Sequence, residues 1–476
     1  MAKEEAVKKE DDISKWYTEV ITKGDLFDYS DVSGCIIIKP YCYQIWEIIK
    51  EETDKRFKKV GIKNCYFPLF IPEKHLSREA EHVEGFAPEV AWVTHTGKTK
   101  LQERLAVRPT SETIMYPSYS KWIRSWRDLP LRLNQWNNVV RWEFKNPVPF
   151  MRSREFLWNE GHTVFATKEE AEAERDQILG IYQDILKNYM AIYGVAGFKS
   201  EKEKFAGAEY TTSIESFLES GKAIQGPDFH HDGQKFAKAF DITFLDKNEK
   251  KQYAWQNTFA ITTRMIGVMV MMHGDNKGLV MPPKVAPLQA VIVPIFKSDN
   301  KESVIKEAEK IKSSLNCRTE LDDRDEYSPG WKFNEYELKG VPIRIEIGPK
   351  DIEANQAVVV RRDTGKKEPV KIPQLKEKVN SLLKEIHDNL YNKSRENFEK
   401  SIVETTDFNE LKKAIADRKM AFAPFCDEIS CEDEIKEAAP GVTTRCSPFD
   451  SKVPKDAKCI YCGKPAKMMI YFAKAY

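Results

Sequence analysis

The stretch from Arg141 to His162, RWEFKNPVPFMRSREFLWNEGH, constrains the fold more than any other part of the chain. Its Pro-x-Pro element fixes the backbone and removes hydrogen-bond donors, so it predicts a turn between two adjacent strands. Alternate residues of a strand share a face, so Arg141 and Glu143 are expected to point together. The same rule puts Trp158, Glu160 and His162 on one face. Such faces suit a ligand that is anionic, cationic and flat, as ATP with an amino acid is. The alternative is the ion-paired outer face of a hairpin.

Length and charge set the outer limits of the prediction. A chain of 476 residues is expected to form two to four domains. Lysine plus arginine (75) nearly balances aspartate plus glutamate (74), so any RNA contact must be local rather than driven by net charge. The longest apolar run, at 265–272, is too short to cross a membrane, so no membrane partner is expected.

The N-terminal sequence MAKEEAVKKEDD is charged and lacks an apolar segment. It therefore resembles neither a signal peptide nor a transit peptide, and a cytoplasmic protein is the default expectation. Residues 1–12 are expected to form a disordered tail.

Five of the nine cysteines lie in the last 51 residues of the chain. Cys426 and Cys431 form one close pair, Cys459 and Cys462 form another, and Cys446 lies between the pairs. Two close pairs in a cytoplasmic protein favour a tetrahedral thiolate zinc site over disulfides. Unliganded core thiols are the alternative, and spacing alone does not exclude Cys446 as a ligand.

Apolar periodicity divides the chain into three blocks. The first, 13–287, is predicted to be an α+β domain around a largely antiparallel sheet. Its expected helices are 13–23, 45–57, 168–193 and 262–272, and its expected strands are 34–39, 65–71 and 253–261. The second, 288–395, alternates strands with helices and is predicted to be a small α/β domain with a mixed sheet. Its expected strands are 288–294, 342–347 and 356–361, and its expected helices are 302–315 and 375–390. The third, 396–476, holds the clustered cysteines.

The segment Thr262–Pro283, TTRMIGVMVMMHGDNKGLVMPP, brings these features together. With the Arg141–His162 segment and the four paired cysteines, it resembles prolyl-tRNA synthetase of the archaeal and eukaryotic-like type, a class IIa aminoacyl-tRNA synthetase. The resemblance runs from about Asp12 to Tyr476. It implies an α+β catalytic domain on an antiparallel class II sheet (13–287), a mixed-sheet α/β anticodon-binding domain (288–395) and a small zinc-bearing α/β C-terminal domain (396–476).

The implied activity is that of a proline--tRNA ligase, which forms prolyl-adenylate from L-proline and ATP and transfers the prolyl group to tRNA(Pro). The implied cofactors are Mg2+ and a structural Zn2+. A homodimer is implied too, because the first class II motif, the helix before Cys65 with the strand through Pro68, forms the dimer interface in that class. The family's C-terminal tyrosine, here Tyr476, reaches back toward the active site.

The resemblance also assigns residues to ATP. Arg141 is implied to bridge the amino-acid carboxylate and the α-phosphate, and a guanidinium can hold both anions at once. Arg264 is implied to hold the γ-phosphate. A cation at a helix N-terminus is disfavoured by the helix dipole, which argues for an anionic partner there. The other implied ATP contacts are Glu143 on the adenine amino edge, Phe156 on the adenine face, Gln225 beside Mg2+, and Arg152, Ser153, Asp228 and Thr262.

For proline, the resemblance implies that Thr110 and Glu112 receive the cationic imino group. The ring pocket is implied to comprise Trp158, Glu160, His162 and His230, beside Arg141. Pocket shape separates ligands that differ by one methylene by only about 1–3 kcal/mol, so alanine and cysteine are expected near-cognates. No inserted editing domain is expected between His162 and Gln225.

Two places depart from the family pattern. Pro227-Asp228-Phe229 stands where the family usually has Gly-Thr-Ser, and Phe259-Ala260 stands where it has Trp-Gly. Both are expected to border the pocket and could reshape it. They leave open a synthetase for a different small amino acid.

The segment 337–356 matches the family's reader of two anticodon guanines. Glu337, Arg344, Lys350 and Asp351 are the implied contacts, because charged side chains can pair with guanine edges on unstacked bases. Solvated surface charges are the alternative. The alternative for the whole chain is a non-catalytic RNA-binding or regulatory paralogue, against which the four residues Thr110, Glu112, Arg141 and Arg264 argue.

Overall fold

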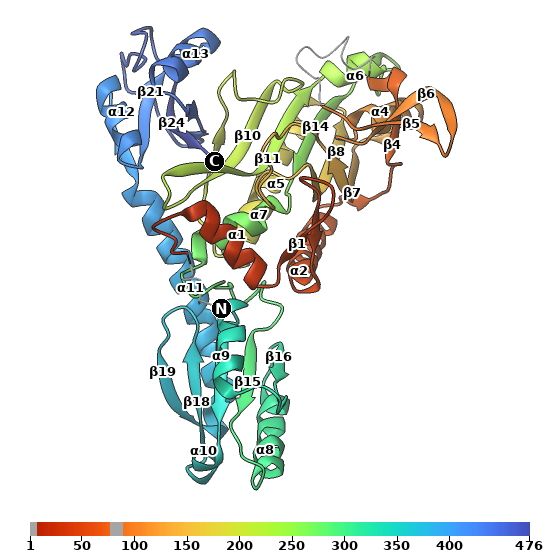
Figure 1. The fold of residues 1–476 in the computed structure, drawn as a ribbon. Helices are drawn as coiled ribbons and strands as arrows, with labels where there is room; N and C mark the ends of the chain where they lie inside the picture. The colour runs from red at the N-terminus through yellow and green to blue at the C-terminus, as the bar shows by residue number, and fades with distance from the viewer. Residues whose placement is uncertain (1–6, 77–88) are drawn as a thin grey trace.

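The computed structural model describes residues 7–76 and 89–476. Figure 1 shows a central sheet flanked by helices, a second small sheet at the bottom, and the C-terminal elements at the upper left. No helix among the described residues is long and apolar enough to cross a membrane. Three small sheets lie outside these parts: β1 (Phe27–Tyr29) with β2 (Ile36–Ile38), β4 (Phe70–Pro72) with β6 (Thr99–Val107) and β5 (Trp92–Thr96), and β12 (Thr243–Leu245) with β13 (Lys251–Tyr253).

The central sheet carries four long neighbouring strands that are all antiparallel: β11 (Lys222–Gly233), β14 (Trp255–Ala260), β8 (Glu155–Phe165) and β7 (Leu131–Val140). Beyond them, β7 pairs with β3 (Lys63–Asn64), and β11 pairs with β10 (Tyr210–Phe217), which pairs with β9 (Val195–Phe198). The predicted antiparallel sheet is therefore confirmed. The interval between β8 and β11 holds one helix and the strands β9 and β10. No inserted domain therefore separates β8 from β11.

The Pro-x-Pro element forms a loop between β7 and β8. Strand β7 ends at Val140, where the backbone leaves the ladder and the Trp142 N–H donates to the Glu89 carbonyl (2.9 Å). Arg141 and Glu143 thus lie in the loop, and the prediction that they share a strand face is wrong. On β8 the prediction holds, because Trp158, Glu160 and His162 all face one cavity.

Helices cover the central sheet. Helix α5 (Lys168–Asn188) starts at a capping box between Thr167 and Glu170 and packs against α2 (Pro40–Lys59). Helix α7 (Arg264–His273) is buried along its length after Arg264, which suits its methionine-rich sequence. The remaining helices of this part are α1 (Ile13–Lys23), α4 (Glu112–Trp122), α6 (Lys235–Phe240) and the short η1 (Trp126–Asp128).

The second sheet has the order β16-β15-β17-β18-β19. Its first three strands are parallel and the last two pair antiparallel, so the predicted mixed sheet is confirmed. The strands are β16 (Thr319–Leu321), β15 (Ala290–Pro294), β17 (Ile343–Ile347), β18 (Gln356–Arg361) and β19 (Lys367–Lys371). The helices are α8 (Lys301–Ser314), α9 (Pro329–Leu338), α10 (Pro349–Glu353), η2 (Ile372–Gln374) and α11 (Leu375–Lys400), which runs beyond the expected boundary at residue 395.

The C-terminal elements extend the central sheet, which the sequence did not predict. Strand β24 (Met468–Ala475) pairs in parallel with β11 at Lys222 and Ala223. Its other neighbours are β21 (Met420–Phe425) and β22 (Val442–Thr444), and β20 (Ile402–Glu404) lies beyond β21. Strand β23 (Ser447–Pro448) pairs with β9. Helices α12 (Phe408–Ala416) and α13 (Ile429–Ala438) complete this part, in which the predicted mixture of helices and strands is confirmed.

The N-terminal segment is partly ordered. The Lys9 N–H donates to Asn276 Oδ1 (2.7 Å), and Lys9 Nζ donates to the Gly274 carbonyl (3.1 Å). Lys9 and Glu10, expected to be part of a disordered tail, thus contact the turn after α7. Residues 1–6 lie outside the described part.

Candidate active site

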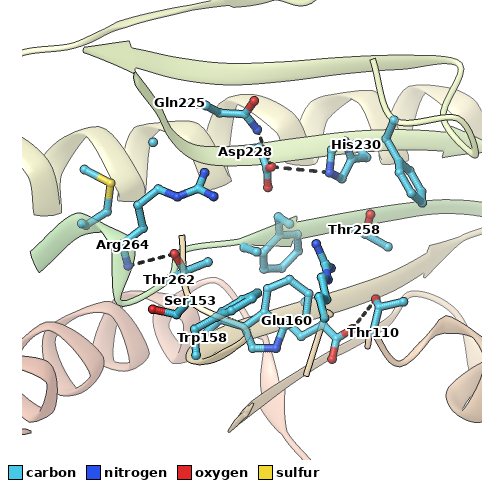
Figure 2. A pocket seen from close by; sticks show the side chains of 18 of the residues that line it. Thr110, Ser153, Trp158, Glu160, Gln225, Asp228, His230, Thr258, Thr262 and Arg264 are labelled. Carbon is cyan, nitrogen blue, oxygen red and sulfur yellow. Dashed lines mark hydrogen bonds and ion pairs between the residues drawn. The ribbon is translucent and has the colours of Figure 1, made fainter. Parts of the chain in front are cut away.

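One cavity of about 230 Å³ lies over β8, β11 and β14, at the N-terminus of α7. Figure 2 shows the side chains that face it. Arg141 and Arg264, far apart in the sequence, both line this cavity. The predicted residues in the lining are Thr110, Glu112, Arg141, Ser153, Phe156, Trp158, Glu160, His162, Gln225, Asp228, His230, Thr262 and Arg264.

Two predicted ATP residues lie outside this lining. Glu143 is exposed in the β7–β8 loop. Arg152 is also exposed; its guanidinium donates to the main-chain oxygen of Tyr476 and lies 5.8 Å from that ring. The Tyr476 N–H donates to the Ala223 carbonyl (3.1 Å), which anchors the end of the chain beside β11.

The two arginines of the cavity are anchored in the same way. Arg141 Nε donates to the Pro109 carbonyl (2.9 Å), and Arg264 Nε donates to the Met151 carbonyl (3.2 Å). Among the described residues neither guanidinium forms an ion pair, so both charges remain for an anionic ligand. Burial lowers the pKa of Arg264, although the charge of Asp228 opposes that shift.

Aromatic rings border the part of the cavity that holds Arg141. The Arg141 guanidinium lies 5.1 Å from the ring of Trp158 and 5.8 Å from that of Phe156. A flat group could stack on Phe156 while its anionic part reaches the arginines.

Asp228 faces the cavity between two polar neighbours. Its Oδ2 accepts a hydrogen bond from Gln225 Nε2 (2.9 Å) and lies 3.7 Å from His230 Nε2. His230 Nδ1 contacts Thr211 Oγ1 at 2.8 Å. Burial lowers the pKa of His230, with Asp228 opposing the shift. A carboxylate at this departure from the family pattern therefore lies within the site, next to Gln225 (Figure 2).

The opposite half of the cavity is a closed hydrogen-bond network around Glu160. Its carboxylate accepts from Ser111 N (2.5 Å), Ser111 Oγ (2.6 Å) and Thr110 Oγ1 (2.8 Å). Gln135 Nε2 (3.3 Å) and His162 Nε2 (3.2 Å) lie on the same carboxylate. Burial raises the pKa of Glu160, but His162 and the hydroxyl donors outweigh it and bring that pKa to about 2. Glu160 is therefore a buried, fully paired anion.

Gly161 and Phe259 fit together at the floor of the cavity. A Cβ on Gly161 would lie 2.1 Å from the Phe259 ring, so only glycine allows this packing. Phe259 and Ala260 line the cavity as expected. Phe229 does not: it is buried in the core and stacks on Phe259, with ring centroids 6.4 Å apart.

Sequence reasoning missed Thr258 in the cavity lining and the buried Asp232, which lies outside that lining. Thr258 lines the cavity, and Asp232 is buried next to Glu112. Neither oxygen of Asp232 has a hydrogen-bond partner among the described residues. Burial raises the pKa of Asp232 well above its usual range. Asp232 lies two residues after His230 and four after Asp228 on β11, so the two-residue period of a strand could have pointed to it.

The four predicted anticodon residues separate into two places on the second sheet. Glu337 and Arg344 border one small groove. Arg344 is buried, pairs with Glu346 through Nε and Nη2 (3.0 and 2.9 Å), and lies 4.2 Å from the Phe333 ring. The other two, Lys350 and Asp351, lie on α10, where Asp351 accepts from the Gly348 N–H (3.0 Å).

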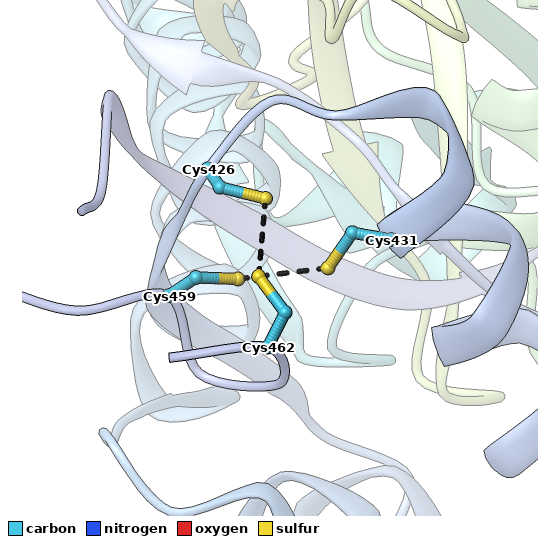
Figure 3. A group of neighbouring side chains, drawn as sticks. All are labelled: Cys426, Cys431, Cys459 and Cys462. Carbon is cyan, nitrogen blue, oxygen red and sulfur yellow. Dashed lines mark hydrogen bonds between the residues drawn. The ribbon is translucent and has the colours of Figure 1, made fainter. Parts of the chain in front are cut away.

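The four paired cysteines converge on one point, as Figure 3 shows. Cys431 and Cys459 sulfurs lie 3.7 Å apart, and those of Cys426 and Cys462 lie 3.6 Å apart. A tetrahedral zinc site with bonds of about 2.3 Å places its sulfurs about 3.8 Å from each other, whereas a disulfide needs about 2.0 Å. The donor set therefore fits zinc. Cys446 is not in this group; its sulfur contacts the Val195 carbonyl at 3.6 Å.

Three family models match the chain. The class II tRNA synthetase core domain (G, H, P, S and T) matches residues 93–273, an anticodon binding domain matches 289–382, and the C-terminal domain of prolyl-tRNA synthetase matches 408–476. Together they follow the order of the three parts seen in the fold.

Full-length relatives agree with these matches. The chain is 52% identical to a proline--tRNA ligase of Alkaliphilus oremlandii, over 99% of this chain and 98% of the relative. It is 50% identical to proline--tRNA ligase 2 of Bacillus cereus, over the full length of both. The cytoplasmic proline--tRNA ligase of Arabidopsis thaliana is 49% identical, over 99% of this chain and 91% of the relative.

Proposed function

The chain belongs to the prolyl-tRNA synthetase family, and we propose that it activates L-proline with ATP and esterifies the prolyl group to the 3′ end of tRNA(Pro). The observation that carries the proposal is the convergence of Arg141 and Arg264, both without an ion pair among the described residues, in one cavity with the Glu160 network. An anionic nucleotide suits the arginines, and a cationic amine suits the carboxylates.

The proposed reaction needs positioning and charge stabilisation rather than covalent catalysis. The proline carboxylate attacks the α-phosphorus of ATP, the bond to the bridging oxygen breaks, and pyrophosphate leaves. Arg141 holds both the carboxylate and the α-phosphate, while Arg264 holds the γ-phosphate at the start of α7. Phe156 offers a face to adenine, and Ser153 and Thr262 offer hydroxyls. Thr110 and Glu112 receive the imino group, and Trp158 with His230 borders the proline ring.

Mg2+ supplies charge neutralisation to the phosphates in this chemistry. Gln225 and Asp228 are the residues that would hold it, since both present oxygen donors to the cavity. The zinc proposed at the four cysteines is structural, because four sulfurs leave no open coordination position.

The second sheet is proposed to bind the anticodon through Glu337, Arg344, Lys350 and Asp351. The buried Arg344–Glu346 pair beside Phe333 supports this, because it fixes a guanidinium next to a ring. The proposed domain limits are 13–287, 288–395 and 396–476.

A homodimer in the cytoplasm completes the proposal. Its support is a set of exposed aromatic side chains on α2 and around β4, where the first class II motif lies. These are Tyr43, Tyr66 (73% exposed) and Phe70. Aromatic residues are enriched in protein–protein interfaces, so these exposed side chains fit a subunit contact.

Pyrophosphate exchange into ATP, measured separately with all twenty amino acids, tests the proposal. Proline should support the fastest exchange, with alanine and cysteine well behind. Exchange that is fastest with another small amino acid would assign the altered residues Asp228 and Ala260 to a different specificity. No exchange with any of them would leave the regulatory paralogue.

A further inference from the structure

The hydroxyl of Thr110 lies between two carboxyl groups. Its Oγ1 is 2.8 Å from Glu160 Oε1 and in a shorter hydrogen bond with Glu112 Oε2. A hydroxyl carries one hydrogen, so it can donate to only one of the two carboxyl groups. The second contact needs a hydrogen from the carboxyl side.

Donor accounting decides which carboxyl group carries that hydrogen. Glu160 already accepts from the Ser111 N–H and the Ser111 hydroxyl, and the Gln135 amide and the His162 ring also lie on its oxygens. A carboxylate with that many donors is ionised. Thr110 therefore donates to Glu160, and Glu112 donates its own hydrogen to Thr110.

The surroundings of Glu112 agree with this assignment. The charged and titratable groups that face it are Glu160 and His162 from β8, with Asp232 from β11. His230 lines the same cavity, and Lys235 of α6 acts on Asp232. Burial raises the pKa of Glu112, and the charge of Glu160 adds to it against the opposing effects of His162 and Thr110. Among the described residues, His162 acts on both carboxyl groups and Arg108 acts on Glu160, so a second anion at Glu112 would share positive charge that Glu160 already uses.

We infer that Glu112 is protonated in the empty cavity and gives its proton to solvent when the ammonium group of the amino acid binds. The inference rests on the proposed function, since it takes Glu112 as the receptor of the imino group. In the bound state the Glu112 carboxylate faces the substrate N–H bonds, and Thr110 keeps its bond to Glu160. The balance is one neutral carboxyl group plus zwitterionic proline giving one carboxylate–ammonium pair plus one proton in solvent.

The physical consequence is a site that avoids an unpaired buried anion before substrate arrives. Only a ligand that brings its own positive charge can replace the lost proton. The site would therefore select cationic amines over neutral analogues of the same shape.

Calorimetric titration of the full-length protein with proline tests the inference. Binding heats measured in phosphate and in Tris at the same pH give the number of protons released, because the two buffers differ in ionisation enthalpy. Free proline stays zwitterionic from pH 5 to 8, so released protons come from the protein. The wild type should release more than half a proton per proline at the acid end of this range, and less as the pH rises through the pKa of Glu112.

Two variants locate the proton. Glu112→Gln keeps a hydrogen-bond donor for Thr110, so it should fold normally, release no proton and bind proline roughly 10- to 100-fold more weakly. Asp232→Asn removes the neighbouring buried carboxyl group, whose pKa burial also raises, and should leave the proton count of the wild type unchanged. If Glu112→Gln binds too weakly to titrate, the unchanged count in Asp232→Asn together with the pH dependence of the wild type still decides.

Proline binding without proton release across pH 5 to 8 would overturn the inference, because Glu112 would already be ionised. Loss of release in Asp232→Asn would assign the proton to Asp232 and overturn it as well. A protein that shows neither proline binding nor proline-dependent exchange would instead refute the proposed function, so the two failures are distinguishable.

Discussion

The two halves of the cavity differ in how far their polar side chains are already paired with other protein groups. In the proline half, Glu160 accepts several hydrogen bonds from buried donors, so its geometry is set before any ligand arrives. In the nucleotide half, Arg141 and Arg264 each have a single backbone acceptor for Nε and no ion pair among the described residues. One half is a finished network, and the other is an incomplete one that an anion would complete. Selectivity is therefore expected from the first and transition-state stabilisation from the second.

Substitution of Arg141 is the strongest test of this difference between the two halves. Arg141→Ala should cost roughly 3 kcal/mol of transition-state stabilisation, because a preorganised charge donor is lost where negative charge develops. The measurement is kcat/KM for proline-dependent pyrophosphate exchange, which should fall more than about 100-fold. Arg395→Ala, on the exposed face of α11, is the matched control and should change nothing. A loss under threefold at Arg141 would remove it from the mechanism.

The proline half should respond through folding as well as binding. Glu160→Gln should lower the free energy of unfolding by about 2–3 kcal/mol near neutral pH, because it removes the anion that several buried donors share. The pKa of Glu160 is depressed to about 2, so this stability is present above the unfolded value of about 4.3 and is lost as pH falls toward 2.

Chemical denaturation of both proteins between pH 7 and 2.5 checks this sign. The difference between wild type and Glu160→Gln should shrink as the pH drops below about 4.5. A difference that stays constant with pH would mean that the folded protein holds Glu160 protonated.

A substitution outside both halves of the cavity measures how large an indirect effect on exchange activity is. Cys459→Ser removes one of four sulfurs, so bound zinc should fall from about one per chain to near zero. The C-terminal part should unfold at lower denaturant concentration, while proline-dependent exchange falls only a few-fold, since none of the four cysteines lines the cavity. Zinc is counted by mass spectrometry of the native protein. Retained stoichiometric zinc would point to Cys446 as a replacement ligand, with Cys446→Ser as the companion variant.

Arg152 should give the smallest effect. It is exposed and already bound to Tyr476, so Arg152→Ala should raise the KM for ATP by no more than about fivefold, the equivalent of an exposed charge contact of about 1 kcal/mol. A loss comparable to that of Arg141 would show that Arg152 leaves Tyr476 and joins the nucleotide half.

Sequence reasoning predicted the position of a residue correctly where a local rule or a long motif included that residue. Period-two alternation placed Trp158, Glu160 and His162 on one face, and the family motifs brought Arg264 to Arg141. The pairing of β24 with β11 had no local signal, because it joins segments some 250 residues apart in the chain. Glu143 was misplaced because β7 ends at Val140, where the backbone turns to a contact with Glu89 that no local pattern signals.

The most direct test is a crystal structure of the protein with a non-hydrolysable prolyl-adenylate analogue. We expect the Arg141 guanidinium within hydrogen-bonding distance of the linkage that mimics the phosphate, and the ring nitrogen of the prolyl group between Thr110 and Glu112. The adenine should lie on Phe156. An analogue bound with its linkage away from Arg141, or outside the cavity altogether, would contradict the account.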